Sequence, residues 1–310
     1  MRNPVRLLLG NPVVLKELRG RMRGPRAFIV LTGFLALVGG FAILLYLGMN
    51  AASRTNTGQV DGGEIGRTLF AGVIGIELFL VTFIAPAFTA GTISGERERQ
   101  TYDLLRTTLL PESQLVMGKL FSALAYVFLL LLAAIPMQSL SFILGGTDLP
   151  DLFISFVILM TTAIFLGTVG IYFSARIKRT LPASISTYGV ALGIVIGTIL
   201  LFFILTVVTA PLLDRSGNVQ ASRTTEWIIL IGRGALICLN PITTLWVSID
   251  ALVEQQSLWA FEYTFQGGSQ GATSTVTLPS PWLVFTVLYL VISALFFMFT
   301  TRRIRQIDEQ

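Results

Sequence analysis

Histidine is absent from this chain of 310 residues, cysteine occurs once, as Cys238, and charged residues make up only 13%. Without histidine and with one cysteine, the chain cannot build a His/Cys zinc site or use histidine as a general acid or base. A single cysteine also excludes a disulfide within the chain. Soluble domains carry about 25% charged residues, so this composition predicts an integral membrane protein.

A phosphate-binding loop is missing as well. Gly118 and Lys119 are followed by Leu120, where the motif requires Ser or Thr, and the upstream glycine is absent. We therefore expect no catalytic residue, no metal and no cofactor in this chain. Although the net charge is +5, the basic residues flank apolar segments, which indicates membrane topology and not nucleic-acid binding.

Hydrophobic residues, 53% of the chain, gather in long segments close to the ~20 residues that cross a bilayer as a helix. We predict an all-α membrane protein, one transmembrane domain over residues 1–310, with six transmembrane helices. They cover residues 27–49, 68–90, 120–144, 152–174, 183–210 and 282–300.

Residues 1–26 are basic and amphipathic. Read as a helix, they place Lys16, Arg19 and Arg23 together, away from an apolar stripe. This pattern predicts a helix lying in the membrane interface. The alternative is an ordinary positively charged flank that fixes topology.

The distribution of basic residues predicts the orientation. If the N-terminus is cytoplasmic, 17 of the 22 Lys and Arg residues fall on the cytoplasmic side. We therefore predict that both termini, and the polar segment between the second and third helices, are cytoplasmic.

The segment 226–253 is apolar but contains Arg233, Asn240-Pro241 and Asp250. A seventh crossing would bury Arg233 and reverse the C-terminal tail, so we predict two short re-entrant helices that break at Asn240-Pro241. Residues 266–280, rich in Gly, Ser and Thr, are then predicted to be an extracellular loop.

The polar segment 95–118 is too charged to lie in lipid. It predicts a cytoplasmic hairpin, with a helix from Glu96 to Leu110 that Pro111 stops and a new helix beginning after that proline. Leucines in a polar loop favour a docking surface for a soluble partner, whereas the alternative is a solvated loop.

Two further features lie inside the predicted membrane helices. Glu77 is a charged group in the second helix, and Gln138 in the third is a possible partner for it. Such a group lines a substrate path or holds two helices together, and the sequence leaves both open. A repeat of every four residues places glycines on one face of the fifth helix, for packing within the chain or against another subunit: Gly189, Gly193 and Gly197.

Three motifs resemble the ABC type-2 exporter permeases: TISGERERQT at residues 92–101, VMGKL at 116–120 and NPVVLKELR at 11–19. The resemblance covers nearly the whole chain. It implies that two permease subunits, as a homo- or heterodimer, work with two copies of a separate ATPase subunit that binds ATP and Mg. It also implies that segment 95–118 is a coupling helix that contacts this ATPase through Glu96, Arg97, Glu98, Arg99, Tyr102, Leu104, Leu105 and Arg106.

The sequence thus predicts the membrane-spanning subunit of an ATP-driven exporter in a prokaryotic cell membrane, a transport subunit and not an enzyme by itself. The alternative is a membrane anchor or sensor whose 95–118 hairpin binds a cytoplasmic regulator. The substrate does not follow from the sequence.

Overall fold

The computed structural model describes residues 20, 25–55, 62–101, 111–213, 223–255, 257–266 and 273–308. Six of the described helices are long and apolar enough to cross a membrane, which confirms the predicted number. They are α3 (Pro25–Thr55), α4 (Gly62–Thr89), α7 (Glu112–Ile143), α8 (Leu149–Arg176), α9 (Thr180–Leu213) and α12 (Pro281–Asp308). The predicted interfacial residues Lys16, Arg19 and Arg23 lie outside the described residues.

The helices are longer than the apolar segments because polar residues extend their ends. Helix α7 begins at Glu112, directly after Pro111, whose extended backbone lets a new helix start as predicted. Helix α8 begins at Leu149, three residues before the predicted start at residue 152, and the Asp148 N–H donates to the Asp151 carboxylate at 2.9 Å. This hydrogen bond is the returning half of a capping box and stabilises the first turn of α8.

Helix α8 forms the centre of the bundle and packs against α4, α7, α9, α11 (Pro241–Gln255) and α12. Its buried side chains include Ile158, Ala163 and Val169. At Gly170 a Cβ atom would clash with Thr89 of α4, so glycine permits this close approach of the two helices. Helix α9 lies at the periphery, and most of its apolar surface is exposed.

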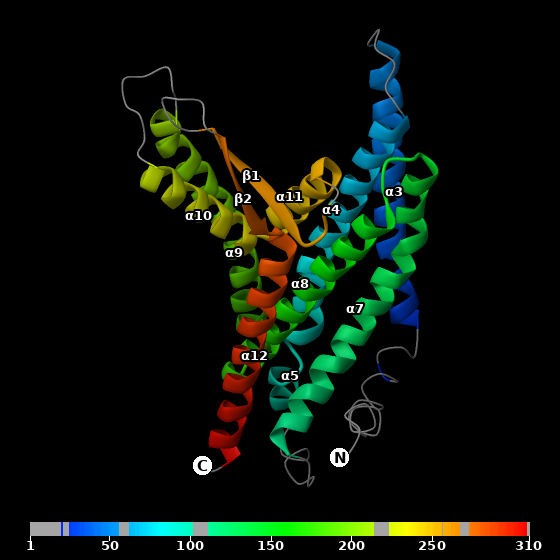
Figure 1. Ribbon diagram of the computed structural model, residues 1–310. Coiled ribbons are helices and arrows are strands. Elements are labelled where there is room, and N and C mark those ends of the chain that lie inside the picture. Colours follow the sequence, from blue (N-terminus) through cyan, green and yellow to red (C-terminus); the bar gives the residue numbers. More distant parts are fainter. Residues whose placement is uncertain are drawn as a thin grey trace, which may run out of the picture.

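The two ends of the bundle differ (Figure 1). The short helix α5 (Ser94–Glu98) and the last turns of α12 lie at one end. The opposite end holds α10 (Arg223–Leu239), α11, and the strands β1 (Ala260–Gln266) and β2 (Thr273–Pro279).

The two strands form an antiparallel hairpin in which Ala260 pairs with Pro279 and Gln266 with Thr273. The chain is mainly helical, as predicted, and this hairpin is the departure from an all-α fold among the described residues. The prediction of a loop over residues 266–280 was wrong where β2 lies. The aromatic residues of β1 alternate with polar ones along the strand, which is a pattern typical of β-structure. This pattern would have allowed β1 to be predicted.

Candidate functional site

Helix α5 is held against α8 by a pair of serines. The backbone N–H groups of Ile93 and Ser94 both donate to Ser174 Oγ, at 2.9 and 3.0 Å, and the two serine oxygens are 3.2 Å apart. The first N–H groups of a helix have no partner within it. Ser174, which is fully buried in α8, therefore supplies the acceptor that an N-cap residue usually supplies.

A partly buried ion pair joins α5 to α7. Lys119 Nζ lies 2.6 Å from Glu96 Oε1 and also donates to the Thr92 carbonyl at 3.3 Å. The Lys119 side chain is 1% exposed and that of Glu96 23%. Because the lysine is almost fully removed from water, loss of either partner would leave a poorly compensated charge.

Two further side chains of α5 reach the ends of α8 and α9. Arg97 donates to the Ala175 carbonyl at 2.9 Å, in the last turn of α8. Glu98 accepts hydrogen bonds from the N–H and the hydroxyl of Thr180, at 2.9 and 3.0 Å, where α9 begins. These hydrogen bonds, the backbone one foremost, lower the pKa of Glu98 below its ordinary value.

Helix α5 ends at Glu98, so the prediction of one continuous helix from Glu96 to Leu110 was wrong. Gln100 adopts the left-handed conformation, with φ at 57°. The Thr101 N–H donates to the Glu96 carbonyl at 2.9 Å and the Gln100 N–H to that of Arg97 at 3.1 Å, which together form a Schellman motif. Glycine usually occupies this left-handed position at the end of a helix, and the sequence has Gln100 there instead.

The described residues directly after α5 are exposed: Arg99, Gln100 and Thr101. The remaining residues predicted to contact a soluble partner lie outside the described residues: Tyr102, Leu104, Leu105 and Arg106. Of the predicted coupling residues, Glu96, Arg97 and Glu98 therefore contact the membrane helices, and Arg99 is exposed.

The structure brings Glu77 and Gln138 together. Gln138 Nε2 donates to Glu77 Oε2 at 2.7 Å, between α4 and α7. Glu77 is fully buried, and its second oxygen, Oε1, has no hydrogen-bond partner among the described residues. Within one chain this pair links two helices.

The glycines of α9 face outward. At Gly189, Gly193 and Gly197, an added Cβ atom would meet no described atom within 4 Å. Helix α9 also exposes large apolar side chains such as Ile196 and Phe203. Packing against the described part of the chain therefore does not explain this stripe.

The break between α10 and α11 falls at Asn240-Pro241, as predicted, and the two helices bend by 112°. Asn240 Nδ2 donates to the Val195 carbonyl at 2.9 Å and to Thr198 Oγ1 at 2.7 Å. Its Oδ1 accepts from the Ile242 N–H at 2.8 Å, which caps α11. Both partners in α9 lie about halfway along that helix, so the bend reaches the middle of the bundle.

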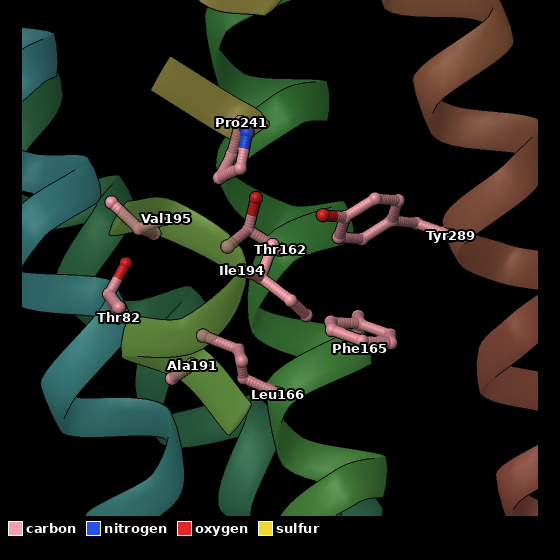
Figure 2. A pocket seen from close by; sticks show the side chains of 9 residues that line it. All are labelled: Thr82, Thr162, Phe165, Leu166, Ala191, Ile194, Val195, Pro241 and Tyr289. Carbon is pink, nitrogen blue, oxygen red and sulfur yellow. The ribbon is translucent and has the colours of Figure 1, made fainter. Parts of the chain in front are cut away.

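A small cavity of about 10 Å³ lies beside the bend. Figure 2 shows the side chains that converge on it from α4, α8, α9, α11 and α12: Thr82, Thr162, Phe165, Leu166, Ala191, Ile194, Val195, Pro241 and Tyr289. The hydroxyls of Thr82 and Thr162 donate to carbonyls of their own helices. The cavity has room for about one water molecule and is too small for a substrate.

The sequence did not assign a structural role to several residues of this framework. Lys119 was noted only within the VMGKL motif, although a charge at the edge of an apolar segment indicates the need for a partner. Ser174 and Thr180 gave no signal, since serine and threonine are common in membrane helices and their partners in α5 are distant in sequence.

Two comparisons with known proteins bear on the family. A search of curated proteins found no match. The model of the family described as ABC-2 family transporter protein matches residues 12–302, nearly the whole chain. As the three motifs predicted, this chain belongs to the ABC-2 transporter permease family and is a multi-pass membrane permease of an ABC transporter.

Proposed function

We propose that this chain is the permease subunit of an ATP-driven exporter in a prokaryotic cell membrane. Two copies of a separate ATPase subunit bind ATP and Mg on the cytoplasmic side, and α5 passes their movement to the membrane helices. The observation that carries this proposal is the attachment of α5 to three helices through Ser174, Lys119 and Thr180.

The attachments of α5 suit it to transmit force. It follows α4 after a short turn, and its polar side chains bind α7, α8 and the start of α9. A partner that binds the exposed residues Arg99 to Thr101 would pull on all four helices together. A solvated loop without such contacts would absorb the movement.

The arrangement of the ends supports a cytoplasmic position for α5 and for the end of α12. Both lie at the same end of the bundle (Figure 1), which also carries Arg176, Lys178, Arg302 and Arg303. Positive residues gather on the cytoplasmic side of membrane proteins. In this orientation, α10 and α11 enter the membrane from the opposite side. The chain turns back at Asn240 and returns to that side without crossing.

The substrate path is proposed to run between two permease subunits. The small cavity beside Pro241 is too small to conduct a substrate. The outward glycine stripe of α9 offers a surface on which a second subunit can approach closely.

A bulky side chain on this stripe tests the interface. Gly193→Phe should reduce the dimer fraction in a cross-linking assay, because the ring would hold the second subunit away from α9. Ile199→Phe is the matched control, since Ile199 is exposed on another face of the same helix, and it should leave the dimer fraction unchanged. An equal dimer fraction in both variants would contradict an interface at the stripe.

Glu77 and Gln138 are proposed to face this path when α4 and α7 separate during transport. Glu77→Gln removes the charge but keeps a side chain that can bond Gln138. Transport should then change while assembly with the ATPase stays intact. Unchanged transport at every pH, with normal folding, would assign the pair a structural role.

A cross-link tests the coupling role. Cys238→Ser gives a chain without cysteine, and Thr101→Cys then places one thiol in the exposed segment directly after α5. We expect a cross-link to a cysteine in the co-expressed ATPase that changes in yield when ATP is added. Thr275→Cys, exposed on β2 at the other end, is the matched control and should give none. Equal yields from both positions, or none from Thr101→Cys in an assembled complex, would contradict the proposal.

A further inference from the structure

An open groove lies between the ends of α8 and α12, at the same end of the molecule as α5. Its volume is about 340 Å³, within the range of roughly 300–1,000 Å³ that is usual for small-molecule sites. The residues that line it are Tyr172, Arg176, Phe299, Arg302 and Arg303. Three guanidinium groups and two aromatic rings thus form the lining, and no carboxylate is among the described residues that line it.

Contacts within the lining hold one arginine in place. Arg176 Nη1 donates to the Tyr172 hydroxyl at 2.9 Å. The Tyr172 ring in turn packs edge-on against Phe296 of α12, with ring centroids 5.2 Å apart. Tyr172, which α12 supports, therefore orients Arg176. Arg176 loses less rotational freedom on binding a ligand than an unrestrained side chain would.

The chemistry of the lining favours a phosphate group. Guanidinium groups donate two parallel hydrogen bonds to phosphate oxygens, and arginine is preferred to lysine where an anion is bound in this way. Topology alone requires positive residues at this end, but it does not require arginines from two separate helices to meet in one groove.

The position of the groove indicates where the phosphate comes from. Arg176 ends α8, and Arg302 and Arg303 lie in the last two turns of α12, where apolar helices meet the headgroup layer. Phe299 lies one turn nearer the apolar part of α12 and is 53% exposed, so it can contact an acyl chain. We propose that this groove binds the headgroup phosphate of an anionic phospholipid, with the acyl chain along Phe299. Basic pockets between membrane helices bind such headgroups in other proteins.

The test measures lipid binding to the purified full chain in neutral detergent by native mass spectrometry. Phosphatidylglycerol is titrated against phosphatidylcholine, which carries a phosphate but no net charge. The test variant is Arg176→Gln with Arg302→Gln. The control, Lys178→Gln with Arg305→Gln, removes two charges from the same end outside the lining.

Each arginine near anionic lipid contributes roughly fivefold to affinity, so the test variant should bind phosphatidylglycerol roughly 30-fold more weakly. The control should keep most of its affinity. Arg302→Lys, which retains the charge but loses the paired hydrogen bonds, should fall between wild type and Arg302→Gln. This conservative variant also serves if the double variant does not fold.

Three results would overturn the proposal. Equal loss in the test and control variants would reduce the groove to general surface charge. Displacement of the lipid by inorganic phosphate at equal concentration would assign the site to a soluble anion. If the test variant lost association with the ATPase while retaining phosphatidylglycerol, the groove would be a protein-binding surface.

Discussion

At the end that contains α5, charged side chains fasten a helix of five residues to its neighbours. Helices α10 and α11 come from the opposite end, and uncharged groups fasten the bend between them. Glu96 and Lys119 pair at the first, and Asn240 bridges to α9 at the second. A charge becomes more costly toward the middle of a bilayer. The bend reaches the middle of α9, so amide and hydroxyl groups suit it, while charged pairs belong at the rim.

The difference also concerns how each irregular segment satisfies its backbone. Near α5, side chains accept hydrogen bonds from the first N–H groups of two helices. Ser174 of α8 does so for α5, and Glu98 of α5 does so for α9. At the bend, Asn240 caps α11 directly, and Tyr289 of α12 donates to the Leu239 carbonyl at 2.6 Å. Neighbouring membrane helices thus supply hydrogen-bond partners in both regions, with charged groups at α5 and neutral groups at the bend.

The largest effect is expected for Lys119→Ala. It leaves Glu96 without its partner in a partly buried position, so the free energy of unfolding should fall by about 3 kcal/mol. Denaturation in mixed micelles measures this loss. The neutral pair Glu96→Gln with Lys119→Met should recover much of it, and Arg99→Ala, which is exposed, should change little. Additive losses in the paired variant would show that the two charges are not coupled.

Asn240→Ala should cost about 2 kcal/mol, because it removes the cap of α11 and both hydrogen bonds to α9. Asn240→Ser keeps a capping oxygen and should lose less. The same denaturation measurement checks both variants. Identical losses for alanine and serine would mean that the bridge to α9, and not the cap, fixes the bend.

Tyr289→Phe should cost about 1 kcal/mol, since it deletes one hydrogen bond to the last carbonyl of α10 and keeps the ring in place. The matched control is Tyr172→Phe, which removes a hydroxyl from the partly exposed end of α8. Thermal unfolding of the two variants in one detergent makes the comparison. A larger fall in melting temperature for Tyr172→Phe than for Tyr289→Phe would contradict the expectation that the hydrogen bond at the bend contributes more stability.

The smallest effect is expected at Glu98 and depends on pH. Its pKa in the folded protein lies below the ordinary value of 4.5, so its bonds to Thr180 stabilise the fold above that value. As the pH falls through the lower folded value, this contribution is lost. The melting temperature of wild type should therefore exceed that of Glu98→Gln at pH 7 and approach it in acid. A difference that grows in acid would reverse the assigned sign.

Much of this fold could be predicted from the sequence because membrane helices are recognised by the length and apolarity of their segments. The break at Asn240-Pro241 was also predicted, since proline cannot continue a helix and asparagine caps one. The pairing of Glu77 with Gln138 followed from the need of buried polar groups for partners.

Other features were not predictable from one sequence. The hydrogen bonds from α5 to Ser174 join residues about eighty positions apart, and local sequence patterns do not predict contacts between such distant residues. The end of α5 was missed because Gln100 takes a conformation that glycine usually occupies. For the stripe at Gly189, Gly193 and Gly197, spacing defined a face of the helix but not what lies against it.

The bend at Asn240 has a consequence for the electric field inside the bundle. Each helix is a dipole, negative at its C-terminus and positive at its N-terminus. The C-terminus of α10 meets the N-terminus of α11 at one residue, so the two partial charges largely cancel. The hydroxyls of Thr243 and Thr244 also donate to the Ile237 carbonyl, at 3.0 and 2.7 Å, which leaves the helix ends little need of water. The tip of the bend therefore carries little net partial charge, although it lies beside the middle of α9.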